Sequence, residues 1–214
     1  MYELLSHDKD VFGEACGIFA GDGSLYATQR SYVLEVRSNK DDLPYYSNFV
    51  KPIFEKILSR KLKIIKRSYR GGYVIGIRAC GKDTERVFHT FLEFPVGKKS
   101  NIARMPKLIF NNHEYWTAYV RGVFDTDGSI YLRKTCKKYW NPVLDISSNS
   151  MQHILQLREI LHQLGFKFWI EKGNRKIRIA GKKNVERFFK EVRPHNNVKL
   201  EKFARIMRTK NDAD

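Results

Sequence analysis

The sequence predicts an α+β protein made of two copies of one αββαββα unit, related by a pseudo-twofold axis. A short motif occurs twice, as ACGIFAGDGSLYA at 15–27 and as VRGVFDTDGSIYL at 120–132. The segments after each motif also keep one order of periodic and turn-rich stretches. We therefore predict an N-terminal repeat over residues 1–105 and a C-terminal repeat over residues 106–214, each with an antiparallel sheet.

Each element of the unit has its own sequence signal. The amphipathic stretches have helical periodicity, the strands alternate, and the Gly71-Gly72 and Gly173-Asn174 pairs suit two-residue hairpin turns. In chain order, we expect a motif helix (7–21 and 112–126), a strand pair (24–38 and 129–147), an amphipathic helix (43–60 and 150–164), a hairpin (61–79 and 166–180) and a closing helix (83–94 and 183–193).

Composition points to a polyanionic partner. The chain has 40 Lys and Arg against 23 Asp and Glu, a formal net charge of +17, while 42% apolar residues suffice for a core. A surplus of this size that is spread along the chain favours nucleic acid over an ordinary basic protein.

Other classes find little support. No apolar run is long enough to span a bilayer, and the N-terminus does not resemble a secretion signal. The cysteines Cys16, Cys80 and Cys136 are too far apart for a structural zinc site, and the histidines form no close ligand pair. We expect an intracellular protein, in the cytoplasm or nucleoid, or in an organelle matrix if an organelle encodes it.

The strands carry basic and aromatic side chains at every second position. Such a face can lie in the major groove of DNA, although an ordinary solvated sheet face has the same pattern. Over 24–32 and 129–139 we expect alternate residues to share the DNA-facing side, and the second hairpins add further cations. The predicted DNA-binding residues are Tyr26, Thr28, Arg30, Tyr32, Arg67, Arg70, Arg78, Tyr131, Arg133, Thr135, Lys137, Lys172, Arg175, Lys176 and Arg178.

The motif helices carry small residues four positions apart. Residues i and i+4 share one helix face, and glycine inside a helix is unfavourable unless a backbone must approach closely. We therefore expect the two helices to pack against each other along these strips. The strips consist of Gly13, Gly17 and Gly21 in the first helix, and of Ala118, Gly122 and Thr126 in the second.

Each motif helix ends in an aspartate, where a helix dipole favours a cation. Packing of the helices brings Asp22 and Asp127 together, and two such carboxylates repel unless a divalent cation lies between them. Oxygen ligands suit Mg²⁺, with Mn²⁺ or Ca²⁺ able to occupy the same sites. We expect Gly23 and Gly128 to adopt left-handed conformations, which would expose the carbonyls of Gly21 and Thr126 as further ligands.

The segments ACGIFAGDG and VRGVFDTDG resemble the two motifs of a single-chain LAGLIDADG homing endonuclease, and the order of elements is similar over about 1–210. The resemblance implies that Asp22 and Asp127 are catalytic. It does not make Asp125 a ligand, because its counterpart is Ala20. It also implies a basic residue after the last helix of each half. Lys98 and Lys199 each lie thirteen residues after a Glu-Arg pair, and Lys99 is an alternative to Lys98. We expect His195 to be an ordinary surface residue.

The resemblance implies a monomeric, intron-encoded endonuclease. It would cut both strands of a long pseudo-palindromic DNA site with Mg²⁺ and leave short 3′ overhangs. Two alternatives remain: a maturase that assists splicing of its host intron RNA, and a DNA-binding regulator on the same scaffold. The second would be expected to lose one or both motif aspartates, which are present here.

Overall fold

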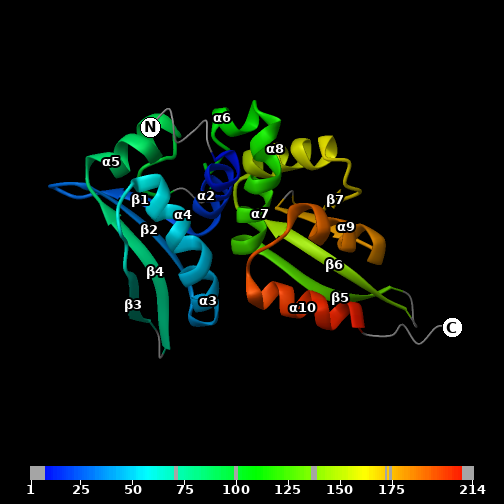
Figure 1. Cartoon of the computed structure of the whole chain (residues 1–214). Coiled ribbons are helices and arrows are strands. Elements are labelled where there is room, and N and C mark those ends of the chain that lie inside the picture. Colours follow the sequence, from blue (N-terminus) through cyan, green and yellow to red (C-terminus); the bar gives the residue numbers. More distant parts are fainter. Residues whose placement is uncertain are drawn as a thin grey trace.

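Two four-stranded antiparallel sheets flank a central pair of helices, α2 (Lys9–Asp22) and α7 (Trp116–Asp127), in the computed structural model (Figure 1). The structure describes residues 8–69, 72–98, 101–135, 139–171, 173 and 175–208. The strand orders are β1-β2-β4-β3 in the first half and β5-β6-β8-β7 in the second. The same order in both halves confirms the predicted α+β class.

The first half contains the expected αββαββα elements. Its second helical segment was expected over 43–60 and runs from Lys40 to Leu58. After α2 come β1 (Gly23–Ala27), β2 (Tyr32–Asn39), the helical run Lys40–Asp42, α3 (Leu43–Tyr45), Tyr46–Val50 and α4 (Lys51–Leu58), then β3 (Ile64–Tyr69), β4 (Gly72–Cys80), α5 (Lys82–Glu85) and the turns of Arg86–Phe91.

The second half repeats this order and adds a helix that the sequence did not lead us to expect. The connecting α6 (Lys107–Phe110) and the turn His113–Tyr115 precede α7, which is followed by β5 (Gly128–Thr135), β6 (Tyr139–Ser147), α8 (Met151–Gln163), β7 (Trp169–Ile170), β8 (Lys176–Ala180), α9 (Lys182–Val192) and the additional α10 (Asn197–Arg208). Asn196 caps the start of α10: its side-chain oxygen accepts a hydrogen bond from the backbone N–H of Val198 at 3.0 Å.

The two central helices touch backbone to backbone. A Cβ on Gly17 would lie 2.2 Å from the carbonyl oxygen of Tyr119, and a Cβ on Gly122 would lie 2.3 Å from that of Glu14. Gly13 is less tightly enclosed, since its Cβ would lie 2.8 Å from the carbonyl oxygen of Tyr115 and 3.1 Å from the Cβ of Ala118. The strips of small residues therefore lie at the helix–helix contact, where glycine is required for space.

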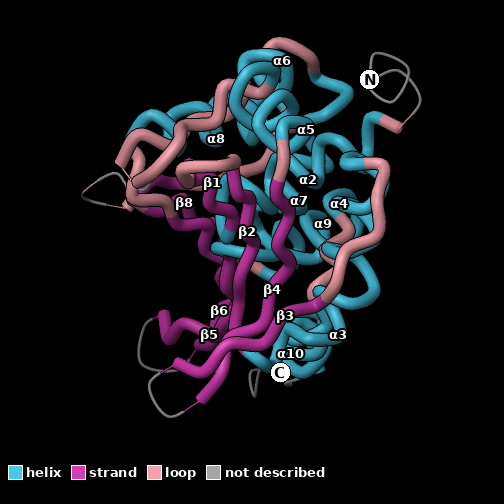
Figure 2. Tube along the Cα trace, turned by 90° about the vertical axis from the view of Figure 1, so that its left-hand side faces the viewer, coloured by secondary structure: helices cyan, strands magenta, loops and turns pink. Residues whose placement is uncertain are grey.

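Each sheet has one apolar and one polar face. Residues on the helix-covered side are fully buried, in keeping with period-two alternation. They include Leu25, Leu34, Val36 and Ile77 in the first sheet, and Ile130, Leu144, Ile146 and Ile177 in the second. In Figure 2 most of the strand segments lie to the left of α3, α4, α9 and α10.

The expected common face over 24–32 is wrong. Residues 28–31 form the turn between β1 and β2, in which the Thr28 hydroxyl donates to the Ser31 carbonyl at 2.8 Å. The turn reverses the chain, so Tyr32 pairs with Ala27 and lies on the core side, stacked on His89 with ring centroids 6.3 Å apart. Only Tyr26 keeps the outward orientation that the alternation predicted.

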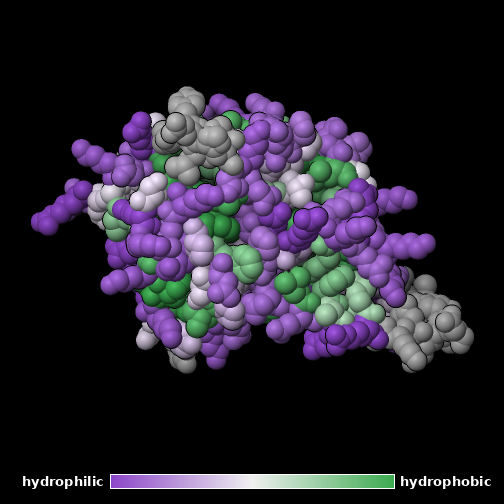
Figure 3. Space-filling view, viewed as in Figure 1, coloured by the Kyte–Doolittle hydropathy of each residue, from purple (hydrophilic) through white to green (hydrophobic). Residues whose placement is uncertain are grey.

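The helix-side surface of the molecule is largely polar. Figure 3 shows hydrophilic side chains over most of this surface, with hydrophobic ones in small separate areas. Within the described part of the chain, no helix is both long and apolar enough to cross a membrane.

Candidate active site

The ends of α2 and α7 bring the two motif aspartates to one place. Asp22 is half-buried and Asp127 is exposed. A Cβ on Gly21 would lie 3.2 Å from Oδ2 of Asp127, which shows how closely the end of α2 approaches the second carboxylate. The sequence therefore places both acids at equivalent helix ends, and helix packing turns that equivalence into spatial proximity.

The glycines after the aspartates differ from the expected left-handed conformation. Gly23 has φ −78° and ψ 153°, and Gly128 has φ −84° and ψ 160°, so both are extended. Space explains why they are glycines: a Cβ on Gly23 would lie 2.3 Å from the ring of Phe19, and one on Gly128 the same distance from the ring of Phe124. The chain thus leaves each helix across the face of a buried phenylalanine.

Asp22 has an unfavourable electrostatic environment for a carboxylate. Burial and the charge of Asp127 together raise the pKa of Asp22 to about 7, while a hydrogen bond from the Tyr46 hydroxyl at 3.1 Å opposes the shift. A site of this kind is stabilised by a cation. Tyr46 was not among the predicted site residues, because nothing in its local pattern separates it from the other aromatic residues of this helical segment.

Lys199 lies beside the same carboxylates from the start of α10. Its ammonium donates to the carbonyl oxygen of Phe124 and, at 3.2 Å, to that of Thr126. Burial lowers the pKa of Lys199 to about 8, although the charges of Asp125 and Asp22 act in the opposite direction. The lysine therefore occupies the negative end of the α7 dipole, a favourable place for a cation.

A pocket of about 540 Å³ lies on the Asp127 side and is lined by Lys98. It also contains the polar residues Ser147, Ser148, Arg175 and Lys176. Lys98 is exposed, whereas Lys199 is half-buried. The surroundings of the two aspartates are therefore unequal. The alternative candidate Lys99 lies outside the described residues.

The two carboxylates are suitable ligands for a divalent cation, whereas the predicted carbonyl ligand of Thr126 is less available. Asp22 and Asp127 supply hard oxygen ligands at one end of the helix pair, as Mg²⁺ prefers. The Thr126 carbonyl already accepts the hydrogen bond from Lys199, so that lysine competes for the lone pairs of this predicted ligand.

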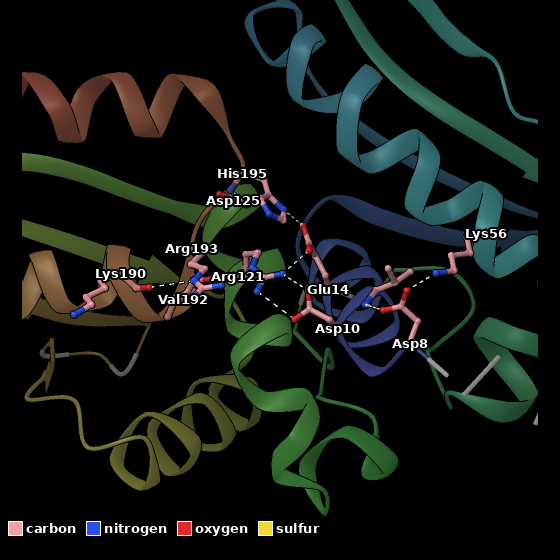
Figure 4. A network of polar contacts seen from close by, with 11 residues as sticks. Asp8, Asp10, Glu14, Lys56, Arg121, Asp125, Lys190, Val192, Arg193 and His195 are labelled. Carbon is pink, nitrogen blue, oxygen red and sulfur yellow. Dashed lines mark hydrogen bonds and ion pairs between the residues drawn. The ribbon is translucent and has the colours of Figure 1, made fainter. Parts of the chain in front are cut away.

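Behind the aspartates, a polar network connects the halves (Figure 4). Arg121 of α7 donates to Glu14 of α2 at 2.9 Å and to Asp10 at 2.7 Å. Nδ1 of His195 lies 2.8 Å from Glu14, and its backbone N–H donates to Asp125 at 2.7 Å. His195 is therefore not the ordinary surface residue that we expected.

Glu14, Asp125 and His195 lie close enough together to be considered as metal ligands. The Arg121 guanidinium already neutralises Glu14, and a bound cation would face this positive charge. We therefore interpret the cluster as an ion-pair network that joins the halves.

The predicted DNA-binding residues of the first half fall into two groups. Arg67 and Arg78 lie on the outer face of the first sheet, where both are about 40% exposed (42% and 41%). Arg30 is exposed in the turn that also contains Thr28. Arg70 lies outside the described residues.

In the second half, Tyr131 and Arg178 lie on the outer face of the second sheet, and both contact Asp145. Arg133 and Arg175 are exposed, and Lys176 is half-buried. Lys137 and Lys172 lie outside the described residues, as does the side chain of Thr135.

Comparison with known protein families matches both halves of the chain. Residues 14–93 match the WhiA LAGLIDADG-like domain, and residues 114–193 match a LAGLIDADG-like domain. A curated relative, the uncharacterized protein MJ0314 of Methanocaldococcus jannaschii, is 23% identical over 162 residues, which are 74% of this chain and 57% of the relative. The chain therefore spans little more than half the length of that relative.

Solved structures with a similar fold cover most of the chain. I-DmoI in complex with DNA and Ca has a TM-score of 0.55 and 17% identity, covering 85% of this chain and 86% of its own. The I-LtrWI LAGLIDADG homing endonuclease bound to target DNA has a TM-score of 0.59 and 10% identity, covering 94% and 91%. I-WcaI bound to its DNA recognition sequence has a TM-score of 0.56 and 18% identity, covering 91% and 86%. At these identities the likeness establishes a shared fold.

Proposed function

Because this chain belongs to the LAGLIDADG family, with one LAGLIDADG-like domain in each half, we propose that it is a metal-dependent DNA endonuclease. The main support for this proposal is that Asp22 and Asp127 lie at equivalent ends of two helices in direct backbone contact. Solved relatives of this fold are bound to DNA, with Ca, Mn or Mg named in several complexes, which supports a divalent metal here.

In this proposal Asp22 and Asp127 hold the metal. A divalent cation supplies the charge that activates a water molecule and stabilises the departing oxygen of a phosphodiester. Lys199 places a positive charge beside Asp22, and Lys98 can do the same beside Asp127. Each lysine is suited to stabilise negative charge that develops on a scissile phosphate.

The finer features of the proposal follow the family and the asymmetry of the site. We infer a monomer that cuts both strands of a long pseudo-palindromic site with Mg²⁺, leaves short 3′ overhangs, and is associated with an intron. The two halves present different side chains on their outer faces: two residues after the buried acid of the strand, β2 has Arg37 and β6 has Ser147. The two half-sites should therefore differ in sequence.

A plasmid that carries the uninterrupted insertion locus tests this function. Wild-type protein should linearise it with Mg²⁺ and not with EDTA. Asp22→Asn and Asp127→Asn should abolish cleavage while DNA affinity stays within a few fold. Asp83→Asn, which changes an exposed acid on α5, should behave as wild type. Sequence-specific binding without cleavage would identify a regulator, and RNA splicing assistance without cleavage would identify a maturase.

A further inference from the structure

Each outer sheet face contains one buried acid at an equivalent position. Glu35 of β2 is fully buried, and Asp145 of β6 is 4% exposed. Both lie on the side away from the helices, since each pairs across the sheet with an arginine rather than with a core residue. The pairs are Glu35 with Arg78 and Asp145 with Arg178.

Acids are unexpected in the middle of a surface that would bind a polyanion. A carboxylate there repels phosphate, and its burial is unfavourable unless donors surround it. The same arrangement in both halves, at positions 35 and 145 of the duplicated strand, indicates a common requirement. The contacts of each acid indicate what that requirement is.

Glu35 is surrounded by three arginines. Arg67 Nη2 lies 2.8 Å from Oε1 and Arg78 Nε lies 3.7 Å from the same oxygen, while Arg37 pairs with Oε2. All three arginine side chains remain between 41% and 42% exposed. A guanidinium has five N–H donors, so each keeps donors free for another partner after pairing with Glu35.

Asp145 has fewer partners than Glu35, and they are less exposed to solvent. Its carboxylate accepts a hydrogen bond from Arg178 Nε at 3.1 Å and from the Tyr131 hydroxyl at 3.2 Å. Arg178 also pairs with Glu171 at 3.1 Å, and its side chain is only 16% exposed. The second acid therefore fixes one tyrosine and one arginine, whereas the first fixes an exposed group of three arginines.

Fixing a side chain before binding lowers the entropy lost when DNA is bound, and it also fixes the direction of its donors. An arginine held in one direction can distinguish guanine from other bases through paired hydrogen bonds, whereas a freely moving one contacts phosphates as readily. We propose that Glu35 and Asp145 are positioning residues that determine sequence specificity, each for one half-site, by orienting the base-reading side chains around it. This inference rests on the proposed DNA-binding function.

Because these acids are negatively charged, removing one should raise DNA affinity and at the same time lower sequence discrimination. Glu35→Gln removes a negative charge beneath the basic face, so affinity for DNA of arbitrary sequence should rise. The freed arginines should at the same time lose discrimination, by about tenfold at a few adjacent base pairs. If the ion pair were merely structural, breaking it would change the affinity for every sequence alike and leave the discrimination between bases unchanged.

The probe is a duplex oligonucleotide library with a randomised core, incubated with the full-length protein in EDTA and sequenced before and after selection. Wild-type protein should enrich one two-part motif. Glu35→Gln should blur one half of the motif and Asp145→Asn the other half. Glu191→Gln, which removes an exposed acid of the Arg187 pair on α9, should leave both halves unchanged.

Two further variants keep the result interpretable if Glu35→Gln folds poorly. Glu35→Asp retains the charge and withdraws it by one methylene group, so it should blur the same half to a smaller extent. Arg78→Lys should affect the same base pairs as Glu35→Gln, with less than additive effects in the double variant. Unchanged motifs in the acid variants, or blurring of both halves by each one, would overturn the proposal. If the wild type enriches no sequence, the proposed function fails and this inference fails with it.

Discussion

Gly17 of α2 and Gly122 of α7 lie in direct contact, and a Cβ on Gly17 would lie 3.0 Å from the Cα of Gly122. This contact sets the distance between the halves and with it the position of both motif aspartates. No other residue type offers the space, because the carbonyl of Tyr119 is closer still.

Substituting the central glycine should destabilise the whole protein. We expect Gly17→Ala to lower the free energy of unfolding by about 3 kcal/mol, since its Cβ would overlap backbone that cannot move independently. Gly13→Ala should cost less, about 2 kcal/mol, because its Cβ would lie 2.8 Å from the nearest backbone atom, the carbonyl oxygen of Tyr115, instead of 2.2 Å as at Gly17. Urea denaturation measures both, and equal losses would contradict the close packing at Gly17.

The raised pKa of Asp22 predicts a pH-dependent effect on stability without metal. The folded-state pKa is about 7 and the unfolded one about 4, so the folded protein binds more protons between these values, and its stability falls as pH rises through this window. Asp22→Asn removes this cost. In EDTA it should raise the free energy of unfolding by about 2 kcal/mol at pH 8 and change it little at pH 4. This value is about half of what the pKa shift would give for a fully buried carboxylate, because Asp22 is only half-buried.

Bound metal should remove the stability advantage that Asp22→Asn has over the wild type in EDTA. Added Mg²⁺ should raise the melting temperature of the wild type and leave that of Asp22→Asn nearly unchanged, because the variant lacks one of the two carboxylates. Asp83→Asn on the exposed surface should respond to pH and to Mg²⁺ as the wild type does. An Asp22→Asn protein that is less stable than the wild type at pH 8 would show that the carboxylate is a structural acceptor for Tyr46.

The lowered pKa of the half-buried Lys199 predicts an alkaline limit to cleavage. Burial lowers the pKa of Lys199 to about 8, so the positive charge is present below this pH and is lost above it. Single-turnover cleavage should therefore decline between pH 7 and pH 9. Lys199→Arg stays protonated throughout and should not show this decline, although its rate at pH 7 should be about tenfold lower because of its larger side chain. Lys202→Arg, on the same helix but exposed, should keep the wild-type profile.

Removing the buried arginine should leave unpaired acids between the halves. We expect Arg121→Met to cost about 3 to 4 kcal/mol of unfolding free energy, because Glu14 is almost completely buried beside it. The double variant with Glu14→Gln should recover part of this loss. Lys9→Met removes the exposed Lys9–Glu114 pair, which also joins the halves, and should cost less than about 0.5 kcal/mol. Similar losses in the two single variants would contradict the role of burial.

Much of this architecture could be predicted because it depends on local patterns. The repeated Asp-Gly motif, the small-residue strips and the alternation of the strands each specify an element or a face without reference to distant residues. Helices predicted over 150–164 and 183–193 form at Met151–Gln163 and Lys182–Val192. The turn at 28–31 was missed because its signal is a hydrogen bond from the Thr28 hydroxyl to the Ser31 carbonyl, and threonine is also a common strand residue.

The sequence by itself determined the duplicated αββαββα unit and the pair of acids at matching helix ends, since periodicity and internal repetition are properties of a linear chain. Only the tertiary structure decided that Gly23 and Gly128 are extended next to phenylalanine rings and that Lys199 reaches the end of α7. It also decided that His195 contacts Glu14, and that Glu35 and Asp145 are buried among cations. Each of these depends on which side chain from a remote segment occupies the neighbouring space. That is decided when the two halves and their sheets pack, and no short stretch of sequence encodes it.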